Sequence, residues 1–465
     1  MATNSTNVGL SQYRNEYLAA IAATISLLAI VASAGRTSPA IPALEKEDSP
    51  IPITANQGSW IVSIPPIGAF FGPIITGLAV DRYGPKRTLL FSVTPLAIGW
   101  ILIIFASNVE TLYAARFLQG ISYGTVYSTI PIYLGEISSN AIRGSTGVLV
   151  IVMANSAYVL EYSVGPYVDF RSLAWISLAL PVIFFVLFIW TPESPYHLLA
   201  HGRNKEALST LCWLRRSDES SDQLEKEFTQ MKALILETKN DNNSSKNLFL
   251  RRNRKSLGIM LLLSCGIQLT GIAAILGYAQ TIFSKLDMDL DAAELSIILA
   301  SVQLITVFIP TFLVDRAGRR PLLLISAGGS SLALITCSIY FTFDAHGYRT
   351  EPLSWVPFVS ILGFIVSFAL GLATVPYAIL SEIFIKNIKA IANALFAMIT
   401  SVVVFVVIKL FQIISDSAGT YVSFWIFSGC TVCTGVLIHV LIPETKGKSF
   451  EEIQKIMTDK LPSNE

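Results

Sequence analysis

Charged residues gather in a short turn that occurs twice in the chain. The first copy is Asp81-Arg82-Tyr83-Gly84-Pro85-Lys86-Arg87, and the second is Asp315-Arg316-Ala317-Gly318-Arg319-Arg320. Such residues can make and break ion pairs, which is a non-covalent chemistry. Each copy lies between two mostly apolar runs of about 20 residues, and its glycine permits a tight bend. The copies stand about half the chain apart, so they predict two similar halves and, in a membrane protein, a transporter.

The sequence offers no set of residues for covalent catalysis. It has four histidines without a metal-ligand cluster, and its five cysteines give no disulfide framework. Cys430 and Cys433 form a C-x-x-C, which we interpret as small buried residues on an apolar helix. No nucleotide-binding loop or nucleophile with a base is present, and the net charge of +1 does not favour nucleic acid. We expect no enzyme activity, no cofactor and no metal.

Composition predicts a membrane protein with many spans. The chain has 465 residues, of which 52% are hydrophobic and 14% charged, with a mean hydropathy of +0.59. Apolar runs long enough to cross a bilayer recur twelve times. We predict spans at 18–40, 60–80, 88–107, 111–134, 145–167, 172–191, 257–284, 294–314, 322–343, 355–380, 390–414 and 421–443.

The distribution of basic residues predicts the orientation. Most of the 33 Lys and Arg residues fall in the segments on one side of the predicted spans, which places both termini in the cytoplasm. We expect short linker helices at 207–214 and 224–236 and a flexible polar segment at 240–247. The predicted division is an N-terminal six-helix bundle at 1–191, cytoplasmic linker helices at 192–256, a C-terminal six-helix bundle at 257–443 and a cytoplasmic tail at 444–465.

Six spans, a central loop, six more spans and a repeated D-R-x-G turn resemble the major facilitator superfamily. Further motifs make the chain similar to its sugar porter family. They are Arg116-x-x-x-Gly120, Pro131 to Glu136, Arg143-Gly144, Pro192-Glu193-Ser194-Pro195, Pro376 with Glu382 and Lys389, and Pro443 to Gly447. The branch that it most resembles is that of the insect facilitated trehalose transporters, through Leu134-Gly135-Glu136, Lys409-x-Phe411-Gln412 and Ser449 to Ile453.

The resemblance implies an all-α membrane fold: twelve helices in two pseudo-symmetric six-helix bundles joined by a short cytoplasmic helical linker. The implied function is facilitative transport of a sugar, trehalose or a hexose, across the plasma membrane by alternating access. The implied partners are the sugar and the lipid bilayer, with the monomer as the functional unit. Three alternatives stay open: a sugar sensor on this scaffold, proton-coupled transport, and transport of another polyol or small solute.

The resemblance also implies a cytoplasmic gate in which charges pair across the two halves. Its residues would be Asp81, Arg82, Lys86, Glu136, Arg143, Glu193, Asp315, Arg316, Arg319, Arg320, Glu382, Lys389 and Glu444. The family usually has arginine where Pro85, Tyr196 and Lys389 stand, and lysine cannot supply the bidentate fork of arginine. We therefore predict a weakened cytoplasmic gate and a resting population shifted toward the inward-open state.

Alignment to the family places the substrate residues mainly on the C-terminal half. They are Gln268, Thr270, Gln303, Tyr377, Thr400 and Ser401, with Tyr278 as a further candidate to replace polar groups that the family usually has. One of two glutamines and an asparagine usual in the seventh span are missing, so the pocket does not match the glucose pattern. A disaccharide, a modified polyol and poor transport all stay open. Gln268 and Gln303 would contact the ligand or, alternatively, hydrogen-bond between helices.

Three ionisable residues lie within apolar spans, where charge is costly and usually paired. They are Arg36, Arg116 and Glu161. We expect Arg36 and Glu161 to form a buried pair and Arg116 to act as a conformational clasp. Proton-coupled relatives carry an acid in the first span, and its absence here favours facilitated diffusion, although Glu161 leaves proton coupling open. We expect Lys409, near the outer end of its span, to extend toward the membrane surface.

Overall fold

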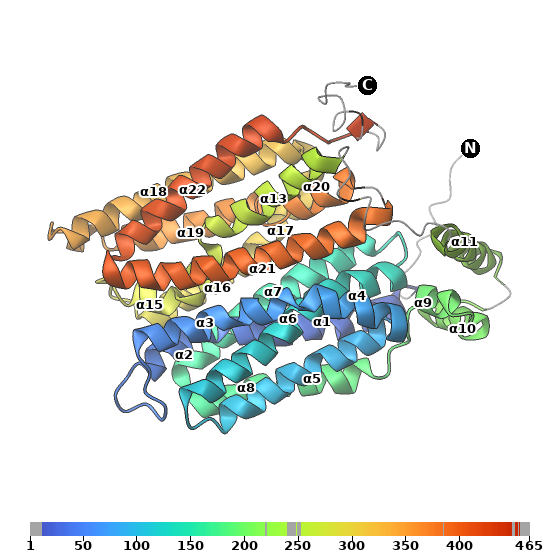
Figure 1. Ribbon diagram of the computed structural model, residues 1–465, viewed down its shortest axis with the longest axis horizontal. Coiled ribbons are helices and arrows are strands. Elements are labelled where there is room, and N and C mark those ends of the chain that lie inside the picture. Colours follow the sequence, from blue (N-terminus) through green and yellow to red (C-terminus); the bar gives the residue numbers. More distant parts are fainter. Residues whose placement is uncertain are drawn as a thin grey trace.

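A computed structural model describes residues 12–218, 221–239, 248, 253–384, 386–448, 452, 453 and 455. The side chains of 237–239, 311, 312, 314–316, 386 and 387 are outside the described set, and so are the predicted flexible segment 240–247 and most of the tail. Figure 1 shows two groups of long helices side by side, the first half of the chain in blue to teal and the second in yellow to red.

The first half contains six spans, two of which are broken in the middle. A break at Arg36 separates α1 from α2, and one at Phe71 separates α3 from α4. The helices are α1 (Arg14–Gly35), α2 (Thr37–Leu44), α3 (Ala55–Phe70), α4 (Gly72–Tyr83), α5 (Pro85–Ile104), α6 (Val109–Ile137), α7 (Arg143–Val164) with the 3-10 turn η1 (Gly165–Tyr167), and α8 (Phe170–Phe188).

The second half repeats this plan with more interruptions. Its seventh span is broken at Thr270–Gly271 and at Tyr278, and its tenth at Gly371–Thr374. The helices are α13 (Arg254–Leu269), α14 (Ile272–Gly277), α15 (Ala279–Phe283), α16 (Ala292–Thr306), α17 (Phe308–Ala317), α18 (Arg319–Ala345), the 3-10 turn η3 (Glu351–Leu353), α19 (Trp355–Leu370), α20 (Val375–Ile383), α21 (Lys386–Ser417) and α22 (Thr420–Leu441).

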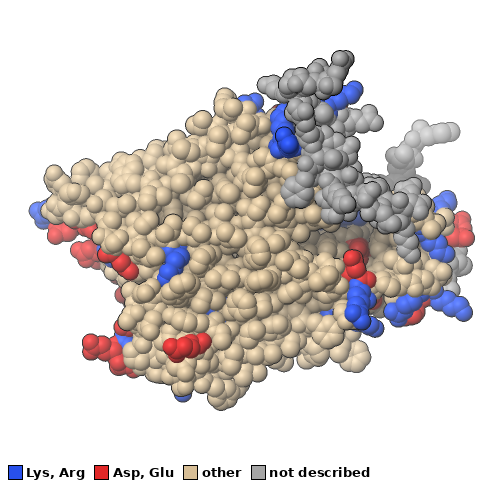
Figure 2. Space-filling model, in the orientation of Figure 1, with Lys and Arg blue, Asp and Glu red and all other residues tan. Residues whose placement is uncertain are grey.

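The prediction of a twelve-helix membrane fold is confirmed. Among the described residues, eleven helical spans are long and apolar enough to cross a membrane. The twelfth is α6, whose 29 residues suffice in length but include the buried polar side chains Arg116, Gln119, Ser122, Thr125 and Thr129. Figure 2 shows the charged side chains gathered toward the two ends of the molecule, with a broad uncharged belt between them, as a bilayer requires.

Glycines allow α6 to touch the second span closely. A Cβ added at Gly120 would lie 2.1 Å from the carbonyl oxygen of Pro65, and one at Gly124 would lie 2.2 Å from that of Ala69. The facing segment carries its own pair, Gly68 and Gly72. Glycines four residues apart on both partners remove the side chains that would hold two helices apart. Backbone-to-backbone contact therefore fixes the position of α6 against the second span.

Three short helices form a separate unit at the end of the molecule where α1 begins and α22 ends (Figure 1). They are α9 (Pro195–Ala200), α10 (Asn204–Arg215) and α11 (Asp222–Lys239), with a small core that includes Leu198, Leu211 and Met231. The predicted linker helices at 207–214 and 224–236 fall within α10 and α11.

Arg215, the last residue of α10, attaches this unit to the first half. Its guanidinium lies 3.0 Å from Glu16 of α1 and 2.6 Å from Glu227 of α11. It also donates a hydrogen bond to the carbonyl oxygen of Ile137 at 2.9 Å. Glu16 is buried and accepts a second hydrogen bond from the amide of Ser139 at 2.7 Å. One arginine thus links the linker helices to α1 and α6.

Candidate functional site

The two charged turns have the same backbone geometry. Gly84 has φ 89° and ψ 160°, and Gly318 has φ 91° and ψ 160°, a left-handed region that favours glycine. A carboxylate packs on each glycine: an added Cβ would lie 2.7 Å from Cδ of Glu193 at the first turn and 2.9 Å from Oε2 of Glu444 at the second. The repeat in the sequence therefore corresponds to a structural repeat.

The second turn has an arginine held between two acids. The Arg319 guanidinium lies 3.0 Å from Oε1 of Glu382, and its backbone amide donates to Oε1 of Glu444 at 3.0 Å. The amide of Arg320 donates to the other oxygen of Glu444 at 3.1 Å. Glu444 thus caps the start of α18 while Arg319 connects the turn to α20. All of these groups belong to the C-terminal half.

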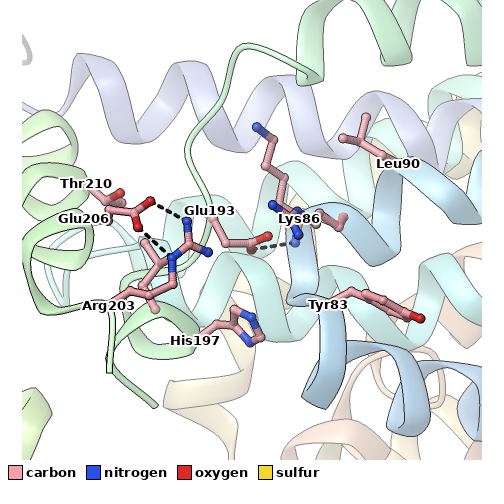
Figure 3. A pocket seen from close by; sticks show the side chains of 10 residues that line it. Tyr83, Lys86, Leu90, Glu193, His197, Arg203, Glu206 and Thr210 are labelled. Atoms are coloured by element: carbon pink, nitrogen blue, oxygen red, sulfur yellow. Dashed lines mark hydrogen bonds and ion pairs between the residues drawn. The ribbon is translucent and has the colours of Figure 1, made fainter. Parts of the chain in front are cut away.

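The first turn lacks the matching arginine because Pro85 occupies its place. Proline has no backbone N–H, so Glu193 accepts instead from the amide of Lys86 at 2.9 Å (Figure 3). Glu136, the counterpart of Glu382, forms no ion pair with a side chain that the structure describes, and its Oε2 atom is buried without a hydrogen-bond partner. Pro85 thus removes both a backbone donor and a cation from the first turn.

This difference changes the ionisation of the two capping acids in opposite directions. Burial raises the pKa of Glu193, because the amides of Ser194, Lys86 and Arg87 do not compensate for lost solvation. Burial acts in the same direction on Glu444, but the amides of Lys446, Arg319, Arg320 and Thr445 together outweigh it and lower its pKa. Glu193 borders a cavity of about 260 Å³ that is also lined by Lys86, His197 and Arg203 (Figure 3).

The remaining predicted gate residues are not paired across the halves in this structure. Asp81, Arg82 and Arg143 are exposed, and Lys389 is half-buried. The side chains of Asp315 and Arg316 lie outside the described set. Among ion pairs in which both side chains are described, none joins the two halves. The cross-half pairs implied for a closed inner side are therefore not formed here among these residues.

At the opposite end, by contrast, the halves are joined by hydrogen bonds. Lys409 of α21 donates to Asn56 at 3.1 Å and to Ser59 at 2.6 Å, and its ammonium lies 4.2 Å from the centre of the Trp60 ring. Lys409, which we expected to extend toward the membrane surface, bonds residues at the start of α3 in the other half. The amide of Gln280 also donates to Ser38 at 3.0 Å. Hydrogen bonds thus join the two halves at the end of the molecule opposite α9–α11.

Arg36 and Glu161 do not form the direct ion pair that we expected. Arg36 donates to the carbonyl oxygen of Phe170 at 2.8 Å and lies 4.1 Å from the centre of the Phe170 ring. Glu161 accepts from the Ser177 hydroxyl at 2.7 Å, and its other oxygen has no partner. The two charges interact electrostatically without contact. Both partners, Phe170 and Ser177, belong to α8, which packs beside α1.

Arg116 has the arrangement expected of a clasp. From α6 it donates to the carbonyl oxygen of Ile61 on α3 at 3.0 Å, and it also bonds the carbonyl oxygen of Ser33 on α1 and the Gln119 side chain. These are neutral acceptors, so the buried guanidinium ties three helices together and has no carboxylate in contact. The role itself stays a prediction.

Four of the seven predicted substrate residues lie where helices of the C-terminal half are broken, whereas Gln303 lies within α16 and Thr400 and Ser401 lie within α21. Gln268 and Thr270 precede the kink at Gly271, and Tyr278 lies at the second break of the seventh span. Tyr377 follows the break at Gly371–Thr374. Broken helices expose backbone and side-chain polar groups at membrane depth, which is how transporters build binding sites.

Their hydrogen bonding divides these residues into two groups. The hydroxyls of Thr270 and Ser401 donate within their own helices, to Ile267 at 2.7 Å and to Ala397 at 2.9 Å. Three polar atoms are buried without a partner: the Tyr278 hydroxyl, Oε1 of Gln303 and Oγ1 of Thr400. Since an unsatisfied buried polar group costs about 1–3 kcal/mol, these three are the stronger candidates for contacting a ligand.

The sequence analysis missed a group of tyrosines on the other half. Tyr123 and Tyr127 are one turn apart on α6, with ring centres 4.7 Å from each other, and Tyr158 lies on the neighbouring α7. Tyr123 and Tyr127 lie within electrostatic range of Tyr377 of the C-terminal half, and Tyr158 lies within range of Tyr123 and Tyr127. Tyrosines four residues apart in a span were the available signal, but they resembled ordinary helix packing.

Comparisons with known proteins agree with this architecture. The model of the family described as "Sugar (and other) transporter" matches residues 10–457. A facilitated trehalose transporter, Tret1 of Bombyx mori, is 33% identical over 448 residues, covering 95% of this chain and 87% of the relative. Tret1 of Culex quinquefasciatus is 31% identical over 449 residues, covering 95% and 86%.

Solved structures with the same fold belong to the major facilitator superfamily. The proton:xylose symporter XylE bound to 6-bromo-6-deoxy-D-glucose superposes with a TM-score of 0.76 at 20% identity, covering 96% of this chain and all of that one. An inward-open XylE from E. coli gives a TM-score of 0.79 at 20% identity, covering 95% and 99%. The twelve broken and unbroken spans, the paired turns and the match over nearly the whole length show that this chain is a multi-pass membrane protein of the sugar (and other) transporter family.

Proposed function

We propose that the protein carries a sugar across the membrane by facilitated diffusion, alternating between outward-facing and inward-facing states. The observation that carries this proposal is the set of three unpartnered polar atoms on Tyr278, Gln303 and Thr400, all in the C-terminal half. Sugar hydroxyls can donate to or accept from each of these atoms. The relatives named as trehalose transporters support a sugar as the substrate class.

The buried charges favour facilitation over proton coupling. The only acid of α1 is Glu16, which is held at the linker end by Arg215 and Ser139. Arg116 has carbonyl and amide acceptors in place of an acid. Glu161 is fixed by Ser177. A coupling acid must exchange its proton between the two sides, and no described acid contacts Arg116.

The arrangement of the gates supports an inward-facing resting state. The hydrogen bonds that the structure describes between the two halves lie toward the outer end, and Pro85 removes a cation from the inner gate. We place α9–α11 and both ends of the chain in the cytoplasm, following the distribution of basic residues. We also propose the plasma membrane as the location, a functional monomer, and no enzymatic activity.

Uptake by purified protein in liposomes tests this proposal. Labelled trehalose, glucose, fructose and a polyol should be offered with and without an inward proton gradient, and the internal concentration should reach, but not exceed, the external one. Gln303→Ala should lower uptake about 10-fold or more, since a buried hydrogen bond to a hydroxyl is lost. Gln412→Ala is the matched control, because its side chain bonds Asp416 at the outer surface.

Two outcomes would overturn the proposal in different ways. Uphill accumulation that depends on the proton gradient and disappears in Glu161→Gln would establish proton coupling. Binding of a sugar without any flux, by protein that is correctly folded and inserted, would favour a sensor. Uptake of the polyol alone would change the substrate class and leave the facilitated mechanism in place.

A further inference from the structure

Two buried arginines of the N-terminal half line one small cavity. It has a volume of about 20 Å³ and lies beside the break between α1 and α2, toward the end of the molecule opposite α9–α11 (Figure 1). Arg36 comes from that break and Arg116 from α6, and each is only 4% exposed. The other lining residues are apolar except Thr37, whose hydroxyl donates to the carbonyl oxygen of Ala34 at 2.6 Å. The cavity therefore brings two cations together in apolar surroundings.

Contacts with acids do not balance these two charges. Arg36 bonds and packs on Phe170, and Arg116 bonds carbonyl and amide oxygens, so neither contacts a carboxylate that the structure describes. Among the described residues that line the cavity, none is acidic. Glu161 interacts with both arginines from a distance, while its contact is with Ser177. Even with Glu161 ionised, two positive charges meet one negative charge, and a buried charge is costly unless it is paired.

Hydrogen-bond donors are in surplus around the two arginines. The Nε atom of Arg36 is buried without an acceptor. The Trp100 ring lies 5.4 Å from the Arg36 guanidinium, and its buried Nε1 atom also has no acceptor. Gln119 accepts from Arg116 at 2.8 Å through its oxygen, which leaves its buried Nε2 atom without a partner. One unpartnered acceptor, Oε2 of Glu161, stands against these three donors. An ion or water that accepts hydrogen bonds accounts for such a surplus, and the excess positive charge favours an anion.

We propose that this cavity is a binding site for a small monatomic anion, with chloride as its natural occupant. Chloride accepts several hydrogen bonds and supplies the missing negative charge. The volume of about 20 Å³ admits one particle of about the size of water and excludes large organic anions such as gluconate. A bound anion would join Arg36, at the α1–α2 break, to Arg116, which already ties α6 to α1 and α3. It would therefore stabilise the N-terminal half, whichever solute the protein carries.

The dependence of stability on chloride tests this site. The full chain in detergent, without sugar, is heated in sodium gluconate in which chloride replaces gluconate at constant ionic strength. The midpoint of thermal unfolding should rise saturably, by about 2 °C or more once chloride is in large excess over its dissociation constant. Arg36→Gln should abolish this rise. Arg171→Gln is the matched control, because this arginine is exposed at the start of α8, and the variant should keep the rise.

Crystals of the wild type grown in bromide give a second measurement, which does not depend on any variant. Anomalous scattering should place a bromide ion within hydrogen-bond distance of both Arg36 and Arg116. The proposal is wrong if the wild-type midpoint is the same in chloride and gluconate, if Arg36→Gln keeps the saturable rise, or if the crystals show only water in the cavity. Should Arg36→Gln fail to fold, the two wild-type results decide. None of these outcomes bears on sugar flux, so the proposed function is tested separately.

Discussion

Lys409 of the C-terminal half donates a hydrogen bond to Ser59 of the N-terminal half at 2.6 Å. The two residues are separated by most of the chain, yet they meet at the outer end, where the Trp60 ring lies beneath the ammonium group. At the opposite end, beside α9–α11, no ion pair joins the two halves among the described side chains. The balance between the contacts at the two ends decides which side is open.

Removing the ammonium group of Lys409 should allow α21 and α3 to separate at this end. Lys409→Met loses two charge-assisted hydrogen bonds, each worth about 1.5–3 kcal/mol, and should shift the population toward the outward-facing state about 10-fold or more. Spectroscopic distances between labels on α3 and α21 measure this shift. Arg349→Met is the control, because Arg349 pairs with Glu351 within its own half. An equal shift in both variants would show that the Lys409 hydrogen bonds do not hold the two halves together at this end.

Restoring an arginine to the first turn should strengthen the inner gate. Gly84 and Gly318 share one backbone geometry, so the arginine introduced by Pro85→Arg can reach Glu136 as Arg319 reaches Glu382. A cysteine placed in the inner vestibule of a cysteine-free background should label more slowly in Pro85→Arg and slowest with Tyr196→Arg and Lys389→Arg added. Arg319→Pro should have the opposite effect. Unchanged labelling throughout would show that the turns do not set the resting state.

The attachment of the linker helices should depend on Arg215. Arg215→Met leaves Glu16 charged and buried, and breaking a buried pair in this way costs about 3–5 kcal/mol. We expect a clearly lower midpoint of thermal unfolding in detergent. Arg203→Met removes an exposed pair with Glu206, which solvent screens, and should change the midpoint little. Similar losses in the two variants would mean that Arg215 does not anchor the unit.

The two capping acids should respond to pH with opposite signs. The pKa of Glu444 is lowered, so its ionised form stabilises the fold above the ordinary value of 4.5, and this stability is lost as the pH falls through the folded pKa. The pKa of Glu193 is raised, so stability falls as the pH rises from 4.5 through the folded pKa. Relative to wild type, Glu444→Gln should therefore lose stability as the pH rises, while Glu193→Gln gains it. Thermal unfolding from about pH 2 to pH 8 measures both, with the Glu444 effect expected below pH 4.5 and the Glu193 effect above it; parallel curves would refute the difference.

The glycine contact between α6 and the second span should not accept a methyl group. Gly120→Ala places a Cβ against the carbonyl oxygen of Pro65 and should cost about 1–3 kcal/mol, with loss of uptake because α6 carries Tyr123 and Tyr127. Gly147→Ala on α7 has no atom within 4 Å of the added Cβ, so it should be tolerated. A stable, active Gly120→Ala would show that the helices can separate without consequence.

The sequence by itself determined the number of spans, the division into two halves and the unequal turns. These depend on local properties: apolar runs long enough to cross a bilayer, and glycines at equivalent positions such as Gly84 and Gly318. The loss of a backbone donor and of a cation from the first turn could also be predicted, because both follow from the chemical structure of Pro85 alone. The predicted substrate residues Gln303 and Thr400 came from alignment and Tyr278 as a candidate replacement, and all three stay predictions.

Only the tertiary structure decided which groups meet. Arg36 and Glu161 lie on neighbouring helices, yet a shift in rotation directs one toward Phe170 and the other toward Ser177. Lys409 joins Ser59 only because the halves are closed at that end, so its partner depends on the conformational state. Helix rotation and the relative position of two halves are set by all contacts together, and no local pattern in the sequence encodes them.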